Sequence, residues 1–160
     1  MTVSKRKAGF TLAPTISIQL HDARWKTLLK PYTKTVRGAC EETLNTRNQK
    51  REKLEIAIVL ADDEFIRGLN KTYRGKDKAT NVLSFVGEGE HLGDIILALE
   101  TIEREAKEQQ KTFRSHAIHL IVHGMLHLLG YDHERSTQAE IMEELEIKIL
   151  KKLMLSNPYL

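Results

Sequence analysis

Residues 123–133 constrain this chain more than any other stretch, because they place three histidines within eleven positions. His123 and His127 are four residues apart, which puts both imidazoles on one face of an α-helix, about one turn from each other. Gly130 favours a helix end, since glycine tolerates the left-handed conformation found there. The chain can then turn back and present His133. The segment therefore predicts a buried helix, a turn after it and three ring nitrogens directed at one point.

These three histidines match the ligand set of a catalytic metal site. Three neutral imidazoles with an open fourth position are typical of catalytic zinc, whereas structural zinc sites are closed by four protein ligands. We therefore predict one Zn²⁺ per chain, bound by His123, His127 and His133, with other divalent transition metals able to occupy the site in purified protein. The alternative is a buried helix whose histidines are ordinary core residues.

Two further histidines precede this group on the same predicted helix. His119 shares the face of His123, but His119 and His127 are about 12 Å apart along a helix axis, so one ion cannot bind both. The histidine after the glycine turn favours the 123/127 pair. We expect His116 and His119 to pack around the site or to hydrogen-bond its ligands.

Gly124 separates this segment from the metalloprotease pattern His-Glu-x-x-His, in which a glutamate follows the first histidine as general base. Peptide hydrolysis by that route is therefore disfavoured. A zinc-bound water ionises near neutral pH without a separate base. Asp132, directly before His133, either assists that step or serves as a turn residue that orients the histidine, and the sequence leaves both interpretations open.

A basic loop over residues 71–78 is the second candidate site. Arg74 carries a permanent charge and can bind a phosphate through two parallel hydrogen bonds, which stabilises the charge that develops during phosphodiester cleavage. Lys71, Lys76 and Lys78 can hold an RNA backbone electrostatically. The alternative is that all four are solvated surface charges.

The segment HGMLHLLGYDH resembles the His-Gly-x-Leu-His-Leu-x-Gly-Tyr-Asp-His signature of the YbeY family of bacterial rRNA maturation endoribonucleases. Residues 70–85, NKTYRGKDKATNVLSF, and residues 92–95, LGDI, resemble two other segments of that family, so the likeness covers roughly residues 54–150. Ala79 and Val86 stand where the family commonly has proline, which affects loop rigidity but removes no chemical group.

The resemblance implies a metal-dependent, single-strand-specific endoribonuclease that acts in rRNA processing, especially 3′-end maturation of small-subunit rRNA, and in ribosome quality control. It implies catalytic roles for Arg74 and His123, with single-stranded RNA, rRNA and the small ribosomal subunit as partners. One alternative is a non-catalytic ribosome assembly factor whose metal stabilises the fold. A second alternative is a metalloprotease, which Gly124 disfavours.

The composition fits one globular domain, with 41% hydrophobic and 29% charged residues in a chain of 160. We expect residues 1–13 to form a flexible basic leader and residues 14–155 a single hydrolase domain. No apolar run is long enough to span a bilayer, and the N-terminus lacks the apolar core of a secretory signal. Cys40 has no cysteine partner in the chain and is expected in the core, so a cytoplasmic location is expected. The net charge of +3 permits nucleic-acid binding without arguing for it.

Hydrophobic periodicity predicts four strands, over residues 16–20, 54–60, 80–85 and 95–98. Helices are predicted over residues 23–46 with a break near Pro31, 64–73 after an Asp62 or Asp63 cap, 99–110, from Ser115, and from Thr137. Helices separate the first three strands, which predicts an α/β fold with a mixed, mostly parallel sheet covered by about five helices. Tyr73 and Phe85 are expected in the core, with stacking on bases as the alternative.

Overall fold

The computed structural model describes residues 14–47, 53–132, 134 and 136–160. The predicted leader at residues 1–13 and His133 lie outside the described residues. The described strands, β1 (Thr15–Leu20), β2 (Glu55–Ala61), β3 (Val82–Val86) and β4 (His91–Ala98), form one sheet in the order β1-β2-β4-β3. β1, β2 and β4 are parallel, and β3 pairs antiparallel with β4. The predicted mixed, mostly parallel sheet is confirmed.

The central strand β2 is buried at most of its positions, as its run of Ile, Val and Leu residues predicts for a parallel strand covered on both faces. Ile58 pairs with Ile18 on one side and with Ile95 on the other. β4 begins at His91, four residues before the predicted start, because His91 pairs with Glu55 of β2. β3 begins at Val82 rather than residue 80.

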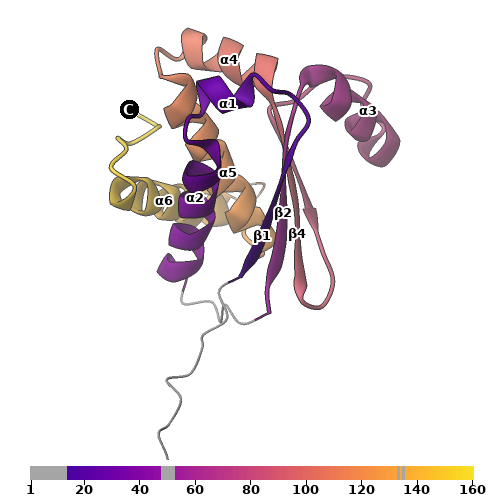
Figure 1. Cartoon of the computed structure of the whole chain (residues 1–160). Coiled ribbons are helices and arrows are strands. Elements are labelled where there is room, and N and C mark those ends of the chain that lie inside the picture. The colour runs from indigo at the N-terminus through magenta and orange to yellow at the C-terminus, as the bar shows by residue number, and fades with distance from the viewer. Residues whose placement is uncertain (1–13, 48–52, 133, 135) are drawn as a thin grey trace, which may run out of the picture.

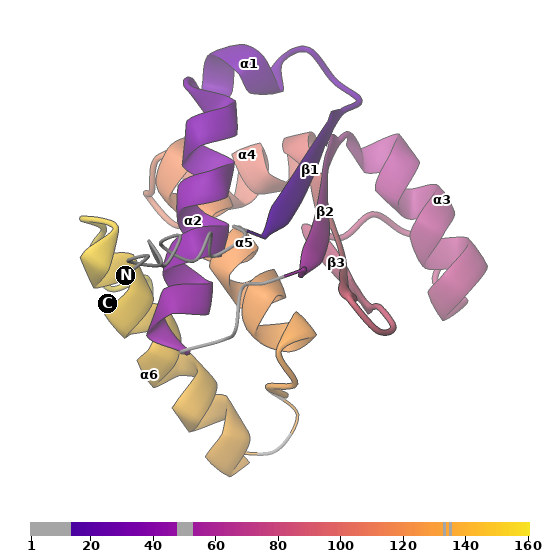
Figure 2. The ribbon, with the colours of Figure 1, turned by 60° about the horizontal axis from the view of Figure 1, so that its bottom comes forward.

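The described residues form six helices, α1 (Trp25–Leu28), α2 (Tyr32–Thr46), α3 (Asp63–Arg74), α4 (Leu99–Glu108), α5 (Phe113–Leu128) and α6 (Ser136–Lys152). α2, α5 and α6 lie on one side of the sheet and α3 on the other (Figures 1 and 2). As predicted, the first helical stretch breaks before Pro31, which is the N-cap of α2.

The main core lies between the sheet and α2, α5 and α6, and a smaller apolar cluster lies beneath α3. Trp25 is completely buried in the main core, where its indole Nε1 donates to the carbonyl oxygen of Ala61 at 2.9 Å. Cys40 is also fully buried, and this burial raises the pKa of its thiol to about 12. It is therefore a core residue, as expected.

At the helix N-termini, the predicted Asp62 cap is confirmed, whereas Asp63 and the start of α5 differ from the predictions. Asp62 caps α3 by accepting from the Phe65 amide at 2.8 Å. Asp63 instead caps α4, where its carboxylate accepts from the amide of Thr101 at 3.0 Å. α5 begins at Phe113, before Ser115, because the Thr112 hydroxyl accepts from the Ser115 amide at 3.0 Å.

The last helix begins at Ser136, one residue before the predicted Thr137.

Within the described part of the chain, no helix has both the length and the apolar composition that crossing a bilayer requires.

Candidate active site

His123 and His127 face each other from successive turns of α5. Their Nε2 atoms are 3.1 Å apart, and their rings lie edge to face with centroids 4.7 Å apart. Two nitrogens bound to one tetrahedral zinc ion at 2.0–2.1 Å would be separated by about 3.3 Å. The geometry of this pair therefore fits two ligands of a single ion. His133 lies outside the described residues, and no cluster of three possible metal ligands occurs among the residues that are described.

A buried carboxylate holds His123 from the side away from His127. Glu146 of α6 has a fully buried side chain and accepts a hydrogen bond from Nδ1 of His123. With the ring proton on Nδ1, the lone pair of Nε2 remains available to a metal, as in carboxylate–histidine–zinc arrangements. His119 donates from Nε2 to the other Glu146 oxygen at 3.1 Å, so it contacts the hydrogen-bond partner of the candidate ligand His123.

The electrostatics of Glu146 suit that role. Burial raises the pKa of the carboxyl, but hydrogen bonds from His119, His123 and Tyr159 outweigh burial and lower the pKa to about 2. Glu146 is therefore ionised at neutral pH. An anion here favours an imidazole that donates from Nδ1.

Sequence reasoning did not single out Glu146. On α6, Ile141 is 50% exposed. The buried residues of α6 are Met142, Glu146, Ile149 and Leu150. Glu146 is four residues from both Met142 and Leu150, so a carboxylate within an apolar stripe was the signal available in the sequence.

A cleft of about 460 Å³ joins the histidines to Arg74. Its lining includes Arg74, His123, His127, Asp132 and residues of β3. Arg74 ends α3, and the following Gly75 adopts φ +67°, a left-handed conformation that allows the chain to turn toward β3. The cleft thus brings the predicted phosphate-binding arginine and the two described metal-ligand candidates together.

Local contacts hold the guanidinium of Arg74 at the cleft wall. Nη2 donates to the carbonyl oxygen of Ser84 at 3.1 Å, and Cζ lies 5.4 Å from the centroid of the Phe85 ring. Phe85 also packs edge-on against Tyr73, with centroids 5.5 Å apart. The prediction of Tyr73 as a core residue is wrong, because its side chain projects from the last turn of α3 and is 67% exposed.

The predicted RNA-binding lysines are exposed but do not line the cleft with Arg74. Lys71, Lys76 and Lys78 lie at the end of α3 and in the loop that follows. Lys71 Nζ is 4.0 Å from a carboxylate oxygen of Asp77, which also accepts from Arg67 Nε at 2.7 Å. Asp77 therefore offsets part of the positive charge of this loop.

Asp132 lines the cleft and also shapes the turn after α5. Its Oδ1 accepts from the amide of Glu134 at 2.9 Å, which is an Asx turn. Glu134 lines the cleft as well, and sequence reasoning did not single it out. Asp132 therefore has the turn contact that was one of its two predicted roles. It also lines the cleft together with His123 and His127.

Close packing explains why glycine stands at position 124. A Cβ atom there would lie 3.0 Å from both Cγ2 of Ile95 and Oγ of Ser84. A glutamate at this position would point into the sheet rather than into the cleft. The absence of the metalloprotease base is therefore built into the contact between α5 and the sheet.

Two other histidines have carboxylate partners. His116 donates from Nε2 to Glu105 at 2.6 Å, so it packs beside the site as expected. His91 begins β4, and its Nε2 lies 3.0 Å from Oδ1 of Asp94. Pairing of its backbone with β2 draws it into the sheet.

The comparison with known proteins identifies the family. Residues 17–154 match the family model described as Endoribonuclease YbeY, which includes both the arginine loop and the histidine helix. The chain belongs to the YbeY family. The family and its enzyme class, endoribonuclease, are those that the sequence motifs implied.

Several YbeY relatives align over most of the chain. Endoribonuclease YbeY from Rhizobium johnstonii is 45% identical, covering 90% of this chain and 92% of the relative. The protein of the same name from Magnetococcus marinus is 52% identical, covering 67% of this chain and 84% of the relative. The solution structure of TM1509 from Thermotoga maritima has a TM-score of 0.56 at 23% identity, covering 88% of this chain and 92% of that chain. That structure shares the fold.

Proposed function

We propose that this YbeY-family chain cleaves single-stranded RNA with one Zn²⁺ bound by His123, His127 and His133. We further propose that its substrate is rRNA, with 3′-end maturation of small-subunit rRNA as the main task, in the cytoplasm and in contact with the small ribosomal subunit. The observation that supports this function best is the shared cleft. Arg74 lines it together with His123 and His127, whose Nε2 atoms face each other.

The residues in and around the cleft have distinct tasks in this proposal. Zinc, when bound, supplies a water of lowered pKa and a positive charge for the phosphoryl oxygens. Arg74 binds a non-bridging phosphate oxygen and stabilises the charge that develops there. Glu146 keeps the proton of His123 on Nδ1, so that Nε2 faces the cleft. Lys71, Lys76 and Lys78 attract the RNA backbone from the adjoining loop.

The size of the cleft favours an unpaired substrate. Its volume of about 460 Å³ is that of a small-ligand pocket. Such a pocket accommodates an extruded or unpaired nucleotide more readily than the bulk of a duplex. The Phe85 ring, whose centroid is 5.4 Å from Cζ of Arg74, packs edge-on against the exposed Tyr73 ring, and we propose that these rings offer surface on which an unpaired base can stack.

The deciding experiment is cleavage of a labelled single-stranded RNA by the wild type and by Arg74→Ala. We expect the variant to cleave roughly 10²- to 10³-fold more slowly, because it loses one charged donor to the transition state. Arg67→Ala is the matched control, since Arg67 lies on the same helix and pairs with Asp77 outside the cleft. It should cleave like the wild type. Metal content and folding are measured for all three proteins.

Equal cleavage by wild type and Arg74→Ala would remove Arg74 from the mechanism and point to a contaminating nuclease. If the wild type leaves free RNA intact, the assay is repeated on isolated small ribosomal subunits. Zinc-loaded, folded protein that cleaves neither substrate would contradict the proposed activity.

A further inference from the structure

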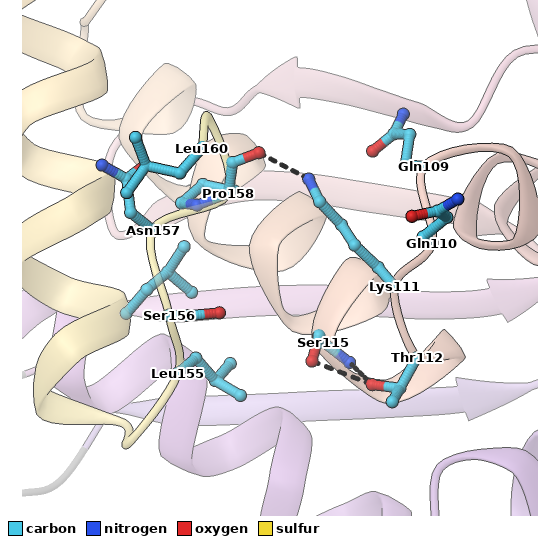
Figure 3. A pocket seen from close by; sticks show the side chains of 11 residues that line it. Gln109, Gln110, Lys111, Thr112, Ser115, Leu155, Ser156, Asn157, Pro158 and Leu160 are labelled. Atoms are coloured by element: carbon cyan, nitrogen blue, oxygen red, sulfur yellow. Dashed lines mark hydrogen bonds between the residues drawn. The ribbon is translucent and has the colours of Figure 1, made fainter.

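The C-terminal segment, residues 155–160, reaches back to the helix that carries the histidines. Lys111, just before α5, donates from Nζ to the carbonyl oxygen of Pro158 at 2.6 Å (Figure 3). The Leu155 amide donates to the carbonyl of Leu150 at 2.8 Å, and the Tyr159 amide donates to Asn157 Oδ1 at 2.8 Å. These contacts fix both ends of the segment and direct Tyr159 toward α5.

Tyr159 completes the surroundings of the buried Glu146. Its hydroxyl donates to the same carboxylate oxygen that accepts from His119, and its ring packs edge-on against the His119 ring, with centroids 5.6 Å apart. The other oxygen accepts from His123. A fully buried carboxylate needs such donors, because an unpaired buried charge is strongly destabilising. The three donors together leave the carboxylate a single orientation.

The contacts form one chain from the C-terminus to the cleft. Tyr159 and His119 hold one oxygen of Glu146, and the other oxygen holds Nδ1 of His123, whose Nε2 faces His127. Removal of the Tyr159 hydroxyl would free Glu146 to rotate toward His119. The His123 ring would then lose its fixed orientation, although its position on α5 would not change.

We propose that Tyr159 is a positioning residue for the metal site and that the C-terminal segment is a strap that sets the orientation of His123 through Glu146. The inference rests on the proposed function, because it assigns His123 Nε2 to a metal. It adds a residue at the end of the chain, outside every motif that the sequence analysis singled out. Outer hydrogen-bond partners of metal ligands typically contribute 10- to 100-fold to metal affinity.

The test is zinc affinity, measured by competition with a chromogenic chelator, for the wild type, Tyr159→Phe, Glu146→Gln and the double variant. We expect Tyr159→Phe to weaken zinc binding about 3- to 10-fold and Glu146→Gln about 10- to 100-fold. The double variant should bind no more weakly than Glu146→Gln alone, because the hydroxyl acts through the carboxylate. Circular dichroism checks that each protein is folded.

Tyr32→Phe is the matched control. Tyr32 begins α2, and its hydroxyl makes no hydrogen bond to another residue that the structure describes. It should bind zinc like the wild type. If the Tyr159 hydroxyl were merely structural, its removal would lower the free energy of unfolding without changing the zinc affinity of the folded protein. That result, or additive losses in the double variant, would overturn the strap.

The outcomes separate this inference from the proposed function. Wild-type protein that binds zinc but cleaves no RNA contradicts the nuclease and leaves the strap intact. Wild-type protein that cleaves RNA while Tyr159→Phe keeps wild-type zinc affinity contradicts the strap alone. A wild type that does not bind zinc overturns both.

Discussion

His116 is buried beside the candidate site with one of its two ring nitrogens paired. Its side chain is 4% exposed, and Nε2 donates to Glu105, which also accepts from Asn81 Nδ2 at 3.0 Å. Nδ1 is buried without a hydrogen-bond partner in the described part of the chain. Burial lowers the pKa of His116, and the neighbouring His119 and Lys111 act in the same direction, against the hydrogen bond to Glu105. Folding therefore favours the neutral ring.

This lowered pKa predicts a pH dependence of stability. The unfolded chain binds a proton at His116 near pH 6.5, whereas the folded protein resists it, so the unfolded state gains protons first as the pH falls. The stabilising contribution is present above that value and is lost on acidification. Between about pH 7.5 and about pH 5.5, the wild type should lose more free energy of unfolding than His116→Gln, measured by urea unfolding.

Gln at position 116 keeps an amide that can donate to Glu105 but cannot titrate. The other histidines are present in both proteins, so the difference in pH dependence between the two proteins reports His116. Both are measured with a chelator present, which removes any contribution from metal release. A steeper loss in the variant would mean that the hydrogen bond to Glu105 outweighs burial in setting the pKa.

At the scale of elements, the contact between α5 and the sheet is close enough to exclude a side chain at one point. A Cβ atom added at Gly124 would lie 3.0 Å from its nearest neighbours, whereas one added at Gly68 of α3 would have no neighbour within 4 Å. Gly68→Ala should raise the free energy of unfolding by about 0.5–1 kcal/mol, as for an exposed helix position. At Gly124 the new methyl group must displace Ile95 and Ser84, so Gly124→Ala should be about 1 kcal/mol or more less stable than Gly68→Ala.

Urea unfolding of the two variants beside the wild type measures this difference. Because both substitutions gain the same helix propensity, their difference reports the packing of α5 on β3 and β4. Equal stabilisation by both would show that the sheet relaxes at no cost, and that packing does not explain the glycine between the two histidines.

At the scale of the whole molecule, the described core is built from apolar side chains and includes neither His123 nor His127. α5 contributes ten buried residues, and it packs against the sheet, α2 and α6 through side chains that are almost completely buried, such as Ile121 and Leu126. A metal bound by His123 and His127 would sit at the edge of this core, where the helix faces the cleft. Metal binding should therefore add stability to a structure that is already folded.

We expect the chelated protein to keep its helical circular dichroism and a cooperative thermal transition. Zinc at about 100 times its dissociation constant should raise the free energy of unfolding by about 2.7 kcal/mol. His127→Ala should fold but lose most of this zinc-dependent gain. A chelated wild type without cooperative unfolding would instead support the assembly-factor alternative, in which the metal holds the fold together.

The features that could be predicted from sequence depend on interactions between near neighbours. The spacing of His123 and His127 is a property of any α-helix, and their convergence follows from it. Pro31 breaks the first helical stretch because it lacks an amide hydrogen. The β-branched residues of β2 and the helices between the strands were sufficient to predict a mixed, mostly parallel sheet.

Only the tertiary structure decided which distant side chains surround these histidines. Glu146 follows His123 by 23 residues, and the side on which α6 docks determined that it, rather than Ile141, is buried. Helical periodicity defines an apolar stripe, but a small rotation of the docked helix changes which residues of that stripe face inward. Tyr159 reaches Glu146 only because the chain folds back after α6. The sequence by itself determined the two histidines on one helix face, whereas non-local packing determined the carboxylate and hydroxyl that orient them.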